Sequence, residues 1–212
     1  MKKGIIFDMD GTLWDSALPV AESWNQVLSQ KEGIDKKITK EDMYQVMGKT
    51  MDIIAEIFFP TIEKNEREVL LKECCQYENE YLSMHGGVLY PNLENMFLEL
   101  EKTYDLYIVS NCQSGYIESF LTYYGFGHYF KDMECFGNTG KKKGANIRLI
   151  VERNGSFEAV YVGDIQGDYE ASKEAGIKFI HAAYGFGTID DIVPAISKPM
   201  DLVSAVKEVF KE

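Results

Sequence analysis

The chain has 212 residues, of which 45 % are hydrophobic and 26 % are charged, so it is long enough for one globular domain with a substantial insertion. Its 34 acidic and 22 basic residues give a formal net charge of −12, which argues against nucleic acid and anionic membranes as partners. Four cysteines without a CxxC pair, together with only three histidines, argue against a zinc site. Because no signal peptide or membrane-spanning apolar run is visible, we expect a cytoplasmic protein. We expect it to be either a monomer or a homodimer.

Residues 3–8 (KGIIFD) form the first predicted strand, and acidic side chains lie at its end. In an extended chain residues i and i+2 point to the same side, so Asp8 and Asp10 can face one small volume. Two close carboxylates repel each other, and a hard cation such as Mg²⁺ relieves the repulsion through oxygen ligands. Gly11 permits a sharp departure of the backbone, and Thr12 can form a hydrogen bond within the turn. An acid-rich turn without a metal is the alternative.

Residues 17–84 show helical patterns and no strand signal. The helices are expected at residues 17–30, 39–47, 51–59 and 62–84. We therefore predict an all-helical cap domain at 15–86, inserted into a catalytic core that comprises residues 1–14 and 87–212. Asp15 and Ser16 lie where the core passes into the cap, and we interpret them as hinge and capping residues.

Strands and helices alternate in the rest of the chain. Strands are expected at residues 106–111, 159–164 and 178–184, and helices at 92–103, 115–124, 144–153, 168–175 and 201–210. The strand segments are almost continuously apolar, which is typical of strands buried on both faces of a parallel sheet. The pattern predicts an α/β fold with a doubly wound, Rossmann-like parallel sheet.

Three further groups of polar residues accompany these strands. Ser110 and Asn111 end one strand and could hold phosphoryl oxygens. Lysines 141–143 precede a helix, and a lysine there could offset the charge of a transferring phosphoryl group. Asp164 ends another strand and Asp168 follows four residues later, so both could serve a metal site. Each group alone also fits a turn, a helix cap or a solvated loop, but together they predict one shared site at the carboxyl ends of the strands.

Taken together, these motifs resemble the haloacid dehalogenase (HAD) superfamily, specifically its phosphoglycolate-phosphatase-like branch, which carries a helical cap after the first motif. DxDGT at residues 8–12 matches the first motif, VSN at 109–111 the second and GDxxxD at 163–168 the fourth. The third motif matches more loosely, because the family's lysine is usually followed by proline, whereas Gly144 follows Lys143. We favour Lys143 over the two lysines that precede it.

The resemblance implies a Mg²⁺-dependent phosphatase that acts on a small phosphorylated metabolite. Asp8 would be the nucleophile that forms an aspartyl-phosphate, and Asp10 would be the general acid and base. The ion would be held by the Asp8 carboxylate, the Asp10 backbone carbonyl and Asp164, with Asp168 as a further ligand or as a supporting residue.

The resemblance also implies residues that bind the phosphoryl group. Ser110, Asn111 and Lys143 would stabilise it, since phosphoryl transfer depends largely on positioning and charge compensation. Gly11 and Thr12 would contribute to the same binding site.

Lys49 lies in a predicted loop between cap helices, where related caps carry a substrate-specificity loop. It could contact an anionic substrate, and a solvated surface lysine is the alternative. Phosphoglycolate, pyrophosphate, a nucleotide and a sugar phosphate all remain possible substrates.

Two alternative functions remain at this point. A sugar phosphomutase of the same superfamily, similar to β-phosphoglucomutase, would use the same four motifs but transfer the phosphoryl group to a second hydroxyl. A phospho-accepting regulatory module also uses an acid cluster on a doubly wound sheet, but such modules are shorter and lack the helical insertion. Asp10 argues against a dehalogenase, which needs no acid for a halide leaving group.

Overall fold

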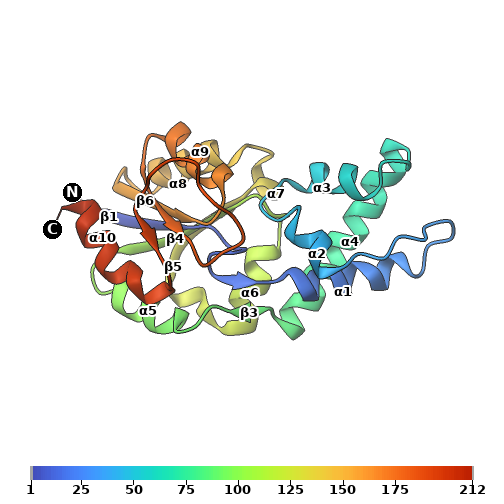
Figure 1. Ribbon diagram of the computed structural model, residues 1–212, viewed down its shortest axis with the longest axis horizontal. Coiled ribbons are helices and arrows are strands. Elements are labelled where there is room, and N and C mark those ends of the chain that lie inside the picture. Colours follow the sequence, from blue (N-terminus) through green and yellow to red (C-terminus); the bar gives the residue numbers. More distant parts are fainter. Residues whose placement is uncertain (1, 212) are drawn as a thin grey trace.

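The computed structural model describes residues 2–211 and contains a six-stranded, entirely parallel sheet in the order β5-β4-β1-β6-β7-β8 (Figure 1). The strands are β1 (Lys3–Phe7), β4 (Asp105–Ser110), β5 (Phe130–Cys135), β6 (Glu158–Gly163), β7 (Lys178–Ala182) and β8 (Ala195–Ile196). Because β1 lies between β4 and β6, the residues that follow β1 emerge at the middle of the sheet.

Helices cover both faces of this sheet, as a doubly wound fold requires. They are α5 (Leu93–Leu100), α6 (Tyr116–Tyr124), α7 (Phe136–Thr139), α8 (Lys143–Arg153), α9 (Gln166–Ala175) and α10 (Leu202–Phe210). Successive side chains of β1 enter different apolar clusters: Ile6 packs with residues of α8 and α9, whereas Ile5 and Phe7 pack with residues of α5, α6 and α10. The predicted α/β fold class is therefore confirmed.

Two strands of the sheet were not expected from the sequence. β8 has only two residues, and β5 lies at the edge of the sheet and mixes apolar with charged side chains. Arg153 of α8 pairs with two of these charges, Asp132 at 2.6 Å and Glu134 at 2.7 Å. Because ion pairs hold its polar face, β5 lacks the continuous apolar pattern that identifies the buried strands.

The inserted segment forms four helices, α1 (Ala17–Leu28), α2 (Lys40–Tyr44), α3 (Met51–Phe58) and α4 (Lys64–His85), seen at the right of Figure 1. A short antiparallel ribbon of β2 (Trp14–Asp15) and β3 (Val88–Leu89) joins them to the core. The division into a core and a cap at residues 15–86 remains our proposal. Within residues 2–211 we find no helix with the length and apolar character needed to cross a membrane.

The interior of the cap contains a buried carboxyl group. Trp24 on α1 and Glu78 on α4 are 1 % and 2 % exposed, and Trp24 Nε1 donates a hydrogen bond to Glu78 Oε2 at 2.5 Å. Burial raises the pKa of Glu78 from 4.5 to about 7, although hydrogen bonds from Trp24 and Gln113 oppose the shift. Because this pKa is higher in the folded protein, ionised Glu78 lowers the stability of the fold.

We predict that Glu78→Gln stabilises the protein more in alkaline than in acidic solution. The stability contributed by Glu78 is fully present below pH 4.5 and is lost as the pH rises through about 7, whereas a neutral amide has no such dependence and still offers Trp24 an acceptor. Relative to the wild type, the free energy of unfolding of E78Q should gain about 1–2 kcal/mol between about pH 5.5 and about pH 8. Urea unfolding at both pH values measures it.

Glu80→Gln provides the matched control, because Glu80 is exposed two positions further along the same helix. The effect of E80Q should not change between the two pH values. An E78Q effect that is equally independent of pH would contradict the prediction.

Candidate active site

The carboxyl ends of three neighbouring strands bring the predicted polar residues together. Asp8 follows β1, Ser110 ends β4 and Asp164 follows β6, and all three side chains are buried. The Asp8 N–H continues the sheet pattern by donating to the Val162 carbonyl of β6 at 2.9 Å. Because the three strands are adjacent and parallel, these side chains share one edge of the sheet, as the sequence predicts.

Lys143 is the lysine that reaches this edge. It begins α8, it is 4 % exposed, and its Nζ lies 2.8 Å from Asp8 Oδ1 and 2.6 Å from Asp168 Oδ1. Lys141 and Lys142, by contrast, are exposed. Burial acts to lower the pKa of Lys143, but the two carboxylates outweigh it and raise the pKa above its ordinary value. The ammonium group therefore stays charged beside Asp8.

Gly144 has a packing role at the start of α8, where the family usually carries proline. A Cβ atom at this position would lie 2.9 Å from the Glu174 carboxyl carbon and 3.0 Å from the Ala171 carbonyl oxygen, both on α9. Glycine thus lets α8 approach α9 closely, and the same two helices carry Lys143 and Asp168.

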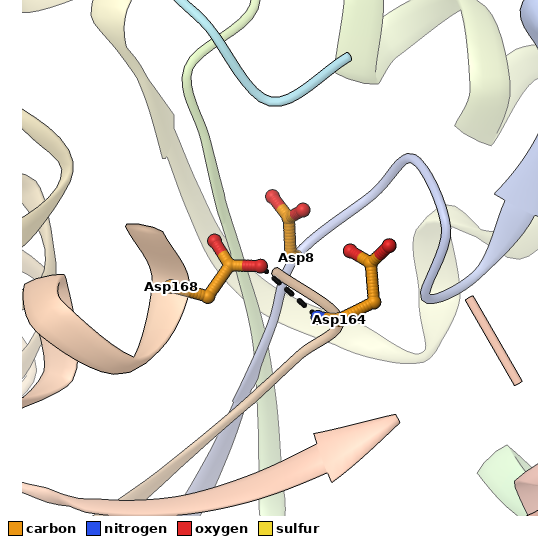
Figure 2. Close-up of side chains that lie close together, drawn as sticks. All are labelled: Asp8, Asp164 and Asp168. Atoms are coloured by element: carbon orange, nitrogen blue, oxygen red, sulfur yellow. Dashed lines mark hydrogen bonds between the residues drawn. The ribbon is translucent and has the colours of Figure 1, made fainter. Parts of the chain in front are cut away.

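Asp168 is held by hydrogen bonds at both of its carboxylate oxygens. Oδ1 faces Lys143, and Oδ2 accepts the backbone N–H groups of Asp164 at 3.0 Å and Ile165 at 3.2 Å, the first of which is drawn in Figure 2. These contacts tie the first turn of α9 to the end of β6. Of the two roles expected for Asp168, the geometry favours positioning of Lys143 over direct metal ligation.

Three carboxylates could hold a metal ion. Asp8, Asp164 and Asp168 each offer an oxygen, and these oxygens lie within 4.8 Å of one another (Figure 2). Asp164 Oδ1 is buried and has no hydrogen-bond partner within residues 2–211, while its Oδ2 accepts the Phe186 N–H at 2.7 Å. Burial, followed by repulsion from Asp168, raises the pKa values of Asp8 and Asp164. Closely spaced carboxylates with an unpartnered oxygen fit a hard divalent cation such as Mg²⁺.

The loop after β1 fits tightly against Asp164. Gly11 has a φ of 83°, and a Cβ atom there would lie 2.0 Å from Asp164 Oδ2. At Gly185 a Cβ atom would lie 2.3 Å from the Gly11 carbonyl oxygen, so both glycines are needed for this close approach. Thr12 forms a hydrogen bond within the turn, as expected, through its backbone N–H to the Met9 carbonyl at 3.1 Å, whereas its buried Oγ1 has no hydrogen-bond partner among the described residues.

Asp10 is oriented by two hydroxyl groups. Its Oδ1 accepts hydrogen bonds from Ser16 Oγ at 2.5 Å and from Tyr116 Oη at 2.6 Å. Burial raises the pKa of Asp10, and these two hydrogen bonds oppose the shift. Ser16 stands at the N-cap of α1 but makes no side-chain capping hydrogen bond, because its hydroxyl group is directed to Asp10. Asp15 supplies the contact instead, since its Oδ1 accepts the Ala17 N–H at 3.0 Å.

Tyr116 and Glu78 are the residues of this region that sequence reasoning missed. Neither belongs to a motif, and Tyr116 lies 106 positions from Asp10 in the chain. Their helices gave only an amphipathic pattern, which assigns an aromatic residue such as Tyr116 to the core. The one available signal was the position of Glu78 in the helical pattern, on the face of α4 that the structure buries.

The cap closes over this site. Asn111 Nδ2 donates to the Gly48 carbonyl at 2.9 Å, so a core residue holds the loop that precedes α3. A cavity of about 40 Å³ remains between core and cap, with Asp8, Asp10 and Glu78 in its wall and the exposed Lys49 also along it. Such a volume accommodates only about three water molecules, so the structure represents a closed form.

The chain is similar to curated proteins over most of its length. The chain is 27 % identical over 206 residues to a phosphoglycolate phosphatase of Aquifex aeolicus, with 94 % of each chain covered. It is 25 % identical over 205 residues to one of Vibrio cholerae, covering 91 % of this chain and 89 % of that protein.

Solved structures show the same fold. A predicted phosphoglycolate phosphatase from Haemophilus somnus superposes with a TM-score of 0.83 at 21 % identity, covering 97 % of this chain and 98 % of that one. A haloacid dehalogenase-like family hydrolase from Streptococcus pneumoniae gives 0.79 at 19 % identity, with the same coverage. The family model for haloacid dehalogenase-like hydrolases matches residues 5–182. The chain therefore belongs to the haloacid dehalogenase-like hydrolase family, as its motifs predicted.

Proposed function

We propose that the protein is a Mg²⁺-dependent phosphatase that hydrolyses a small phosphomonoester through an aspartyl-phosphate on Asp8. The observation that carries the proposal is the buried contact of Lys143 Nζ with Asp8, 2.8 Å from Oδ1, beside the unpartnered Oδ1 of Asp164. This pairs a candidate nucleophile with a fixed cation for the phosphoryl group. Membership of the hydrolase family and the relatives named phosphoglycolate phosphatase support the same activity.

Asp8 and Asp10 divide the covalent steps between them. A carboxylate oxygen of Asp8 forms a bond to phosphorus while the bond from phosphorus to the ester oxygen breaks, and Asp10 gives its proton to the departing oxygen. In the second step Asp10 takes a proton from water, whose oxygen attacks phosphorus and releases phosphate from Asp8. The hydrogen bonds of Ser16 and Tyr116 hold Asp10 in place for both transfers.

The other site residues bind and position the phosphoryl group. Lys143 and Ser110 would compensate charge on its oxygens, with Gly11 and Thr12 shaping the loop beside them. Asn111 would keep the cap loop over the site through Gly48.

The metal site would be made by the Asp8 carboxylate, Asp164 and the backbone carbonyl of Asp10, with Asp168 holding Lys143. The ion, when bound, supplies positive charge that stabilises the phosphoryl oxygens. Lys49, which is exposed along the cavity, would attract an anionic substrate.

Replacing the nucleophile tests the proposal most directly. Asp8→Asn removes the attacking carboxylate at nearly constant shape, so phosphate release from small phosphomonoesters should fall by about 10³-fold or more. Steady-state phosphate release from a metabolite panel measures it. Asp35→Asn, at an exposed position in the cap, should retain wild-type activity. Turnover by D8N close to that of the wild type would exclude the mechanism.

Metal dependence has two independent readouts. Removing divalent ions with EDTA should abolish phosphate release, and Mg²⁺ should restore it. Because a ligand that binds the folded state stabilises it, Mg²⁺ should also raise the unfolding temperature of the wild type. Asp164→Asn should lose most of that rise, because its Oδ1 no longer offers a charged ligand. Full turnover in EDTA would contradict the assignment of a metal.

Tyr116 provides a test of the role of Asp10. Tyr116→Phe removes one of the two hydrogen bonds that orient the acid, and we expect kcat to fall by about tenfold with little change in KM. Tyr123→Phe on the same helix, where the side chain is 42 % exposed, is the matched control and should be silent. A Y116F enzyme that changes only KM would assign Tyr116 to substrate binding instead.

A further inference from the structure

One buried ionisable group in the cavity has no part in the proposed chemistry. Glu78 of α4 is 2 % exposed, yet it lines the same cavity as Asp8 and Asp10. Burial is the main cause of the raised pKa of Glu78, and the charge of Asp10, which lines the same cavity, adds to it. Glu78 thus faces the region that the leaving group of a substrate would occupy, on the cap side of the site.

Glu78 accepts a hydrogen bond from a neutral donor, Trp24 Nε1, at 2.5 Å. The neutral side chain of Gln113 lines the same cavity, and its Nε2 donates to Asn79 Oδ1 at 3.1 Å. In the part of the chain that the structure describes, no lysine, arginine or histidine pairs with this carboxylate. Because an indole N–H can only donate, Glu78 must accept at this oxygen, which suits the carboxylate form.

The rest of the cavity wall does little to offset the negative charge of Glu78. Asp8 is already paired with Lys143, and the only other cation along the cavity in the described chain is the exposed Lys49. The remaining cap residues of the wall are largely apolar: Val20, Trp24, Met43, Val46, Met47, Met51 and Ile54. A leaving group that carries a carboxylate would therefore meet a like charge in a poorly solvated space.

The cost of this carboxylate also argues for a function. Since burial raises its pKa to about 7, ionised Glu78 lowers the stability of the cap. Proteins tend to retain such destabilising groups where binding or catalysis needs them. A glutamine or methionine would fill the same space without a charge.

We infer that Glu78 binds the leaving group of the substrate and selects phosphomonoesters that carry a hydroxyl or an ammonium group there, against those that carry a carboxylate. The inference rests on the proposed phosphatase function and names the substrate class of the same site. It separates this chain from a phosphoglycolate phosphatase, because the leaving group of 2-phosphoglycolate ends in a carboxylate. A hydroxyl or ammonium group would donate a hydrogen bond to Glu78, and a carboxylate would be repelled.

Phosphomonoesters with leaving groups of equal length test the inference. The panel is 2-hydroxyethyl phosphate, phosphoethanolamine, ethyl phosphate and 2-phosphoglycolate, each assayed with the wild type, E78Q and the exposed control E80Q. The wild type should show a kcat/KM for the better of the first two that exceeds that for 2-phosphoglycolate by about tenfold or more. In E78Q this ratio should fall by about tenfold, with ethyl phosphate changed by less than about threefold.

The ratio distinguishes substrate contact from a purely structural role. A structural defect in E78Q would lower all four kcat/KM values together, which would overturn the inference, as would a wild type that prefers 2-phosphoglycolate. Glu78→Asp keeps the charge, so this variant should still prefer the hydroxyl or ammonium ester to 2-phosphoglycolate. If E78Q loses more kcat/KM for phosphoethanolamine than for 2-hydroxyethyl phosphate, the inference holds for the ammonium group, which the charge of Glu78 would select.

Failure of the proposed function would look different. In that case none of the four esters would release phosphate, or D8N would match the wild type, and the inference would fall with the function. If phosphate release depends on Asp8 but E78Q keeps the substrate preference of the wild type, the inference about Glu78 is overturned. The proposed phosphatase function would still stand.

Discussion

The site depends on a buried contact of one ammonium group with two carboxylates. Lys143 lies between Asp8 and Asp168 with almost no exposure to solvent, and the three residues come from α8, the end of β1 and α9. Burying these charges is unfavourable unless they pair and form further hydrogen bonds. The backbone N–H groups that bind Asp168 supply such hydrogen bonds, and the glycine after Lys143 lets α8 lie close enough to α9 for the pairing. The same contact fixes the packing of two helices and aims a cation at the proposed nucleophile.

Much of the core and its candidate site could be predicted from the sequence. Asp8 and Asp164 follow apolar strands, and adjacency in a parallel sheet is enough to bring them together. Tyr116 and Glu78 could not be found this way, because their importance arises only where α6 and α4 meet the cavity, far along the chain from Asp10. Helical periodicity reports that such residues face inward, but it does not say what they face. The edge strand β5 was not predicted for a related reason, because its ion pairs with Arg153 are tertiary contacts that the local sequence does not reveal.

The core side and the cap side of the site would contact different parts of the substrate. The core supplies a charge arrangement that would suit any phosphoryl group, since its residues would act on oxygens common to all such substrates. The proposed cap supplies Glu78 and an apolar wall, which would act on the part of the substrate that differs between compounds. Relatives at 25–27 % identity can thus share the first half and diverge in the second.

The hydrogen bond between Asn111 and Gly48 has a kinetic consequence. It joins the end of β4 to the cap loop beside the cavity, so any opening of the cap that admits a substrate or releases a product would have to break it. Its strength therefore contributes to the barrier for opening, while the β2–β3 ribbon keeps the cap attached throughout. Asn111, a residue of the second motif, would in this way hold the cap closed. Opening of the cap would then limit the rate of turnover whenever the chemistry at Asp8 is faster than opening.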